Sequence, residues 1–127
     1  MKKIIHTDNA PKAIGPYSQA VEANGMVFLS GQLPIDPSTG KFVEGGIKEQ
    51  TEQVLKNLGA ILQQAGCSYN NVVKVTCLLS TMEDFAAMNE VYTKYFTSEF
   101  PARAAYAIKQ LPMNALVEME AFAVKNS

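Results

Sequence analysis

The chain has 127 residues, of which 47% are apolar and 18% are charged, a composition typical of one globular domain rather than a disordered or fibrous chain. Eleven basic residues stand against twelve acidic ones, and the net charge of −1 disfavours a nucleic-acid binder, which needs a basic surface. One histidine and two cysteines without a CxxC motif disfavour a His/Cys metal site. We therefore expect one domain over residues 1–127 that uses no metal and no cofactor.

The N-terminus carries two lysines but lacks the following apolar stretch of about 7–15 residues that a signal peptide has. No run approaches the roughly 18 apolar residues of a membrane-spanning helix. These features predict a cytoplasmic protein with no membrane partner. In that compartment Cys67 and Cys77 are expected to be reduced, small buried side chains.

The first predicted elements are a short edge strand over residues 2–6, a loop over 9–16 and a hairpin. The hairpin strands, residues 17–23 and 26–32, flank Asn24-Gly25. An Asn-Gly pair between apolar runs favours a two-residue type I′ turn, because both central residues of that turn need a positive φ.

This turn also sets the register of the hairpin. If Ala23 faces Met26, alternate residues of the two strands lie on one face of the sheet. That face then contains Tyr17, Gln19, Val21, Phe28, Ser30 and Gln32. The register therefore predicts that Tyr17 and Ser30 lie close together at the open end of the hairpin.

Two helices are predicted in the rest of the chain. Apolar residues of 47–65 recur at i, i+3, i+4 and i+7, which predicts an amphipathic helix that Gly66 ends with a left-handed cap. The later elements are a strand over 72–80, a helix over 82–96 with Asn89 beside its buried stripe, and strands over 103–109 and 116–125.

The resulting order is β-β-β-α-β-α-β-β, an α+β fold in which a mixed sheet carries both helices on one face. The last strand is largely apolar on both sides, since Val117 and Met119 alternate with side chains that include Phe122 and Val124. Two helices cover only one face. The second face needs another cover, and the simplest cover is another copy of the chain.

Arg103 opens a strand of small residues, Ala-Arg-Ala-Ala-Tyr-Ala, and two interpretations of it remain open. It is either a solvated edge arginine or the floor of a pocket. In a pocket, its planar guanidinium would clamp a carboxylate through two parallel hydrogen bonds.

Glu118 and Glu120 lie two residues apart on one strand and so share a face among apolar neighbours. The pattern alone favours an exposed acidic stripe, or ion-pair partners for Arg103 and Lys109. The functional alternative is a general base or a water-orienting carboxylate whose pKa is raised by burial.

Several separate segments together resemble one family. They are IGPYSQA (residues 14–20), LSGQLP (29–34), DPSTG (36–40), DFAAMN (84–89), PAR (101–103) and VEME (117–120). In this order and spacing the chain resembles the RidA/YjgF/UK114 family of reactive-intermediate deaminases over nearly its whole length. The family hydrolyses 2-imino and enamine acids such as 2-iminobutanoate and 2-iminopropanoate, without a cofactor, to 2-oxo acids and ammonia.

The resemblance implies a chorismate-mutase-like homotrimer around a central barrel, with a pocket at each subunit interface. It implies that Arg103 anchors the substrate carboxylate and that Glu118 positions the attacking water. The other pocket positions that it implies are Tyr17, Ser30, Gly31, Asn89 and Ala105, the last in place of a cysteine common in the family. A non-catalytic carboxylate-binding or regulatory protein of the same fold is the alternative, and an endoribonuclease or translation inhibitor is disfavoured by the charge.

Two arrangements of the last two strands in the sheet are possible. A simple hairpin would put Arg103 opposite Glu118, whereas the resemblance implies a further strand between them. We favour the intervening strand and expect Arg103 and Glu118 to converge on one pocket by sharing a face.

Overall fold

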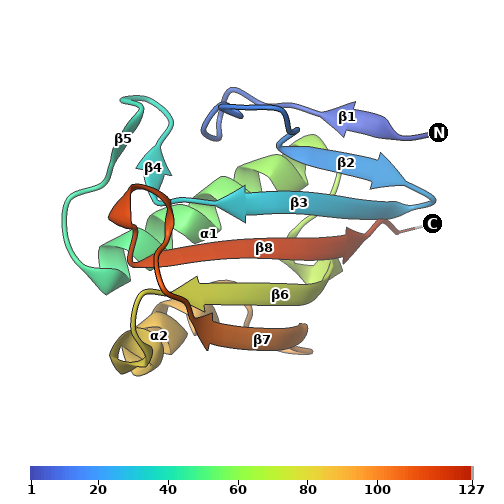
Figure 1. The fold of residues 1–127 in the computed structure, drawn as a ribbon. Helices are drawn as coiled ribbons and strands as arrows, with labels where there is room; N and C mark the ends of the chain where they lie inside the picture. The colour runs from blue at the N-terminus through green and yellow to red at the C-terminus, as the bar shows by residue number, and fades with distance from the viewer. Residues whose placement is uncertain (127) are drawn as a thin grey trace.

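The computed structural model describes residues 1–126 as a six-stranded sheet with two helices behind it and a small hairpin at one end (Figure 1). The strand order is β1-β2-β3-β8-β6-β7, antiparallel throughout except for the parallel β6–β7 pair. The strands of this sheet are β1 (Lys3–Ile5), β2 (Ala20–Ala23), β3 (Met26–Gln32), β6 (Val72–Leu79), β7 (Ala102–Ala107) and β8 (Val117–Val124). The helices are α1 (Ile47–Gln64) and α2 (Phe85–Tyr95), and neither is long and apolar enough to cross a membrane.

The predicted hairpin is present with its predicted register. Ala23 pairs with Met26, and Asn24 and Gly25 have φ values of 52° and 76°, as a type I′ turn requires. Strand β2 is shorter than predicted, because the chain leaves the sheet before Ala20. One further hydrogen bond continues the ladder, in which the Ser30 amide donates to the Gln19 carbonyl at 2.9 Å.

Both helices pack their apolar stripes on the same side of the sheet. Helix α1 ends where predicted, with Gly66 at φ +80°. Its stripe packs with the buried side chains of β3, β6 and β8, including Val27, Val75 and Met119. The predicted second helix is divided into a short 3₁₀ turn (Met82–Asp84) and α2. The α+β class and the one-sided cover of the sheet are confirmed.

A second, two-stranded sheet was not predicted. Strands β4 (Ile35–Asp36) and β5 (Lys41–Phe42) flank the predicted turn at residues 36–40. The Asn57 side-chain amide of α1 donates to the carbonyls of Leu33 and Ile35, at 3.1 and 2.9 Å. These bonds fix the segment that leaves β3 and so shape the cavity described below.

Strand β6 lies between β7 and β8, so the expectation of an intervening strand is confirmed. On β6, Val75 pairs with Arg103 and Leu78 pairs with Glu118. An offset of three residues reverses the side of a strand, because side chains alternate. Val75 is completely buried under the helices. Arg103 is therefore on the helix side and Glu118 on the open side, and the expectation that they share a face is wrong.

The open face of the sheet carries large apolar side chains. Phe28 and Phe122 are 39% and 36% exposed and meet edge to face, with ring centroids 5.4 Å apart. Tyr106 and Val124 are also exposed. Figure 1 shows both helices behind the sheet, so neither helix covers this face.

Candidate functional site

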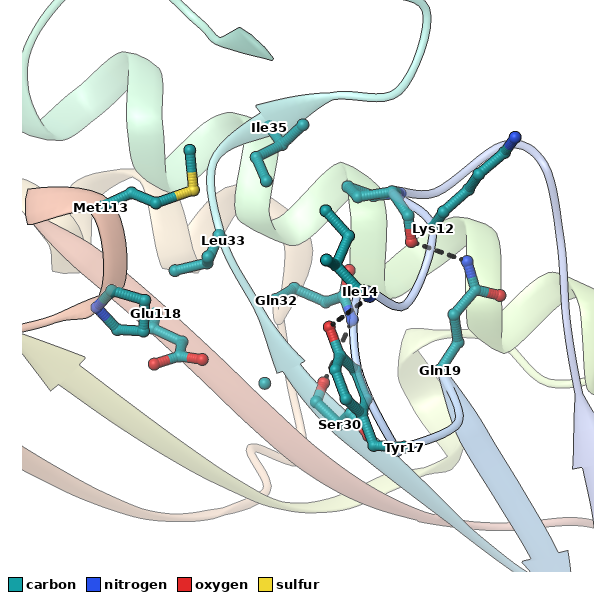
Figure 2. A pocket seen from close by; sticks show the side chains of 13 residues that line it. Lys12, Ile14, Tyr17, Gln19, Ser30, Gln32, Leu33, Ile35, Met113 and Glu118 are labelled. Atoms are coloured by element: carbon teal, nitrogen blue, oxygen red, sulfur yellow. Dashed lines mark hydrogen bonds between the residues drawn. The ribbon is translucent and has the colours of Figure 1, made fainter. Parts of the chain in front are cut away.

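A cavity of about 580 Å³ opens where β3 and β8 approach the loop that follows residue 9 (Figure 2). It brings together four of the sequence-predicted site residues: Tyr17, Ser30, Gly31 and Glu118. Tyr17 and Ser30 line the same cavity as predicted, but Tyr17 lies on the loop before β2 and not on the hairpin strand. The remaining lining residues are Pro11, Lys12, Ile14, Gln19, Gln32, Leu33, Ile35, Pro112 and Met113.

The polar wall of this cavity is held by local hydrogen bonds. The Ser30 hydroxyl donates to the Ser18 carbonyl at 2.6 Å, and the Tyr17 hydroxyl accepts from the Ile14 amide at 3.4 Å. The buried Gln19 amide donates to the Thr7 and Pro11 carbonyls, which ties the N-terminal loop to the hairpin. The loop that carries Tyr17 is therefore fixed although it is outside the sheet.

Glu118 is half-buried at the floor of the cavity. Burial raises the pKa of its carboxyl above the ordinary value of 4.5, and the negative charge of Glu120 raises it further. Among residues 1–126, ion pairs join Lys48 to Glu90 and Lys125 to Glu22, and the His6 ring contacts the Asp8 carboxylate. Within residues 1–126 of one copy, neither Arg103 nor Lys109 forms an ion pair with Glu118.

The close approach of the Glu118 carboxylate requires a glycine at position 31. Strand β3 has a bulge between Leu29 and Gln32, and there the backbone of Gly31 lies directly beside the Glu118 carboxylate. A Cβ on Gly31 would collide with the Glu118 carboxylate oxygen Oε2. Only glycine leaves this carboxylate its observed position.

Arg103 and Asn89 line a different cavity, of about 530 Å³, at the β7 edge. The Arg103 guanidinium is exposed, yet it is oriented by three side chains of α2. Its Nη1 donates to Asn89 Oδ1 at 2.7 Å, and it lies over the rings of Phe85 and Tyr92, at 5.3 and 4.8 Å from their centroids. Arg103 is thus an exposed edge arginine whose guanidinium is oriented by α2, and its role as a carboxylate clamp stays a prediction.

The contact of Phe85 and Tyr92 with Arg103 was not predicted from the sequence. Residues 85, 89 and 92 follow the i, i+4, i+7 spacing of one helix face. The position of Asn89 between Phe85 and Tyr92 on one helix face was the sequence signal that could have indicated a binding site for a guanidinium. Tyr92 is 4% exposed, its hydroxyl has no hydrogen-bond partner among residues 1–126, and burial raises its pKa to about 12.

Ala105 lies on the helix side, like Arg103, and pairs in register with Cys77 of β6. It packs against the buried core. Burial raises the pKa of the Cys77 thiol to about 11, so Cys77 stays a protonated core side chain. No cluster of three or more His, Cys, Asp or Glu side chains within residues 1–126 is arranged to hold a metal ion.

The predicted site is therefore divided into two halves. One half offers a carboxylate of raised pKa with hydroxyl groups nearby, and the other offers an oriented guanidinium with an amide. Strand β6 separates the strands that carry these halves, and the halves open on different sides of the sheet. One copy of the chain does not bring them together.

The chain is similar over nearly its whole length to one family of known proteins. The family model described as Endoribonuclease L-PSP matches residues 7–125. A RutC family protein of Pyrococcus horikoshii is 56% identical over 98% of this chain and 99% of its own. The mouse 2-iminobutanoate/2-iminopropanoate deaminase is 53% identical over 98% of this chain and 93% of its own. A solved structure from Thermotoga maritima, described as a candidate endoribonuclease, is 54% identical with a TM-score of 0.97, and both chains are covered completely.

Proposed function

The chain belongs to the Endoribonuclease L-PSP family, the RidA/YjgF family that the sequence resembles, and on that premise we propose that it hydrolyses 2-imino acids to 2-oxo acids and ammonia. The substrate class rests on relatives such as the mouse enzyme, whose name gives 2-iminobutanoate and 2-iminopropanoate. The observation that carries the proposal is the pair of complementary half-sites, an oriented guanidinium and a half-buried carboxylate.

The chemistry needs few groups, because the carbon of a protonated imine is already electrophilic. The Arg103 guanidinium binds the substrate carboxylate through two charge-assisted hydrogen bonds. Glu118 orients a water molecule and takes one of its protons as the water oxygen bonds to the imine carbon. The π electrons of the C=N bond move to nitrogen, and a neutral carbinolamine results.

The carbinolamine then collapses. Glu118 returns its proton to the nitrogen and the C–N bond breaks, and the hydroxyl oxygen forms the carbonyl as its proton passes through Glu118 to the departing ammonia. The net reaction of iminium and water gives a 2-oxo acid and ammonium. The raised pKa of Glu118 suits both steps, since a base nearer neutrality also returns a proton more readily.

The two half-sites meet in this proposal between copies of the chain in a homotrimer. The exposed apolar face around Phe28 and Phe122 supports this, since a face of that kind on a small chain is suited to a second copy. Arg103 of one copy would then approach Glu118 of its neighbour.

A coupled assay tests the function. A pyridoxal-phosphate-dependent threonine dehydratase releases 2-iminobutanoate, and the purified chain should speed the appearance of 2-oxobutanoate. Arg103→Ala should abolish the effect, and Arg103→Lys should be poor because it keeps the charge but loses the planar fork. Lys109→Ala removes an exposed cation outside both cavities and is the matched control. Equal rates for folded wild type and Arg103→Ala would refute the proposal.

Two further measurements separate the alternatives. A carboxylate-binding regulatory protein would bind 2-oxo acids in calorimetry without any imine turnover. The family's description keeps endoribonuclease activity as a second candidate. That candidate predicts RNA cleavage that persists after removal of contaminating nucleases and is lost in a single pocket variant.

A further inference from the structure

Helix α1 carries two buried amide side chains among the apolar residues that face the sheet. Gln50 is 8% exposed and Asn57 is 1% exposed. They are about two helical turns apart and therefore lie on one face of the helix. A buried amide is costly unless its polar atoms have hydrogen-bond partners, so the partners of these two side chains indicate what the side chains do.

Asn57 holds the chain where it leaves β3. Its Nδ2 donates to the carbonyls of Leu33 and Ile35, and its Oδ1 accepts from Gln53 Nε2 at 2.9 Å. Both ends of the amide are therefore occupied. Leu33 closely follows Gly31, so these bonds fix the backbone directly beyond the bulge that carries Gly31.

Gln50 holds the chain where it enters β8. Its Oε1 accepts a hydrogen bond from the Leu116 amide at 2.9 Å. The Leu116 carbonyl in turn accepts from the Ser80 amide at 3.1 Å. Leu116 shortly precedes Glu118, so the backbone that leads to Glu118 is held both by the helix and by the end of β6.

The two held segments flank one close contact, in which the Glu118 carboxylate lies beside the backbone of Gly31. Strand β3 ends and β8 begins at the same end of the sheet, where Gln32 pairs with Met119. Figure 1 shows α1 running behind both strands. Apolar packing is non-directional and lets strands slide by small amounts, whereas hydrogen bonds of fixed geometry set the strand positions.

We propose, on the basis of the proposed function, that Gln50 and Asn57 are positioning residues, which keep the Glu118 carboxylate where it orients the attacking water. Neither side chain touches the substrate, because both are buried under α1. Loss of either set of bonds should therefore lower the rate of the chemical step. Substrate affinity should change little, because Arg103 of the other half-site binds the substrate carboxylate.

The test compares two substitutions of Gln50 in the coupled threonine dehydratase assay, with the supply of 2-iminobutanoate varied. Gln50→Met has a similar length but no acceptor oxygen, so it leaves the Leu116 amide without this partner. Its kcat should be about tenfold to 10²-fold lower, with KM within about twofold of the wild type. Gln50→Glu keeps an acceptor oxygen and should retain a kcat within about threefold of the wild type.

Asn57→Leu is the second test of the proposal, and it also applies if Gln50→Met does not fold. It removes the bonds to the carbonyls of Leu33 and Ile35 and keeps a side chain of similar size. The proposal predicts the same lower kcat at a nearly constant KM.

Leu62→Ala is the control for a general loss of stability. Leu62 is 1% exposed and lies in the last turn of α1, far along the helix from Gln50. Its truncation leaves a cavity and should lower the melting temperature at least as much as Gln50→Met does. When each variant is assayed well below its melting temperature, Leu62→Ala should keep the wild-type kcat and KM.

A double variant tests whether Gln50 acts through the contact between Glu118 and Gly31. In the wild-type background Gly31→Ala should lower kcat about 10²-fold, because the added Cβ displaces the carboxylate. In the Gln50→Met background the carboxylate is already displaced, so the same substitution should lower kcat by less than about tenfold. Effects that simply multiply would place the action of Gln50 elsewhere and overturn the inference.

The outcomes separate this inference from the proposed function. Imine hydrolysis by the wild type with an unchanged kcat in folded Gln50→Met overturns the positioning role and leaves the deaminase proposal standing. A kcat that falls equally in Gln50→Met and Leu62→Ala also overturns the role, because the rate would then follow stability. Absence of hydrolysis by the folded wild type overturns both. A low kcat in Gln50→Met that Gln50→Glu restores, at constant KM, supports the inference.

Discussion

Arg103 and Glu118 lie on opposite faces of one sheet, with only β6 between the strands that carry them. Val75 and Leu78, their partners on β6, are three positions apart, and this odd offset sends the two side chains in opposite directions. The guanidinium and the carboxylate of a single copy therefore cannot contact the same small substrate. Their joint use requires two copies, and the following predictions derive from that requirement.

The first prediction concerns the assembly. Light scattering should give about three times the chain mass of 13.8 kDa. Phe122→Asp places a charge on the exposed apolar face and should dissociate the assembly and abolish imine hydrolysis, while circular dichroism stays that of the wild type. A wild type of monomeric mass that still hydrolyses imines would contradict the shared site.

The second prediction concerns pH. Because Glu118 acts as a base only when ionised, kcat/KM should fall on the acid side with an apparent pKa above the ordinary carboxyl value of 4.5. Glu120→Gln removes a negative charge that raises this pKa, so the acid limb should move to lower pH. The apparent pKa should stay above the ordinary carboxyl value, because burial is the larger cause of the shift. Glu83→Gln, at an exposed glutamate of the 3₁₀ turn before α2, is the control. An acid limb with the same apparent pKa in wild type and Glu120→Gln would contradict this role for Glu120.

The third prediction concerns the aromatic rings under Arg103. Tyr92→Leu and Phe85→Leu should each raise KM about threefold to tenfold with a smaller effect on kcat, because Arg103 binds the carboxylate in ground and transition states alike. Tyr92→Phe keeps the ring and should retain a wild-type KM. It also removes a buried hydroxyl that has no hydrogen-bond partner among residues 1–126, so the melting temperature should be equal or higher. A raised KM in Tyr92→Phe would refute the stacking explanation.

The fourth prediction concerns Gly31. Gly31→Ala should displace the Glu118 carboxylate and lower kcat about 10²-fold, since a misplacement of about 1 Å costs that much. Gly46→Ala is the matched control, because a Cβ there meets nothing within 4 Å and Gly46 has a negative φ of −104°. Equal kcat values for the two variants would show that the position of Glu118 does not depend on Gly31.

Local features of this fold could be predicted from the sequence because short-range rules decide them. Asn24-Gly25 sets a turn whose register pairs Ala23 with Met26, and the spacing of apolar residues in 47–65 places one stripe against the sheet. The Gly66 cap follows from the same local rules. In each case the interacting residues are close in sequence.

The relation between distant strands could not be predicted in this way. The side on which Arg103 lies depends on its register with Val75, twenty-eight positions earlier in the chain, across a parallel pair. The contact of Arg103 with Phe85 and Tyr92 depends on where α2 packs, and burial in the core explains those two aromatic residues equally well before the packing is known. The division of the site into halves is thus a property of tertiary structure.

The most direct test of the shared site mixes two inactive variants. Arg103→Ala keeps Glu118 and Glu118→Gln keeps Arg103, so copies that exchange in an equal mixture should rebuild intact sites at about a quarter of the interfaces of a cyclic assembly. We predict that co-refolded Arg103→Ala and Glu118→Gln recover about a quarter of the wild-type imine hydrolysis, whereas two differently tagged Arg103→Ala preparations recover none. A mixed assembly that forms by light scattering and stays as inactive as either variant alone would contradict the account.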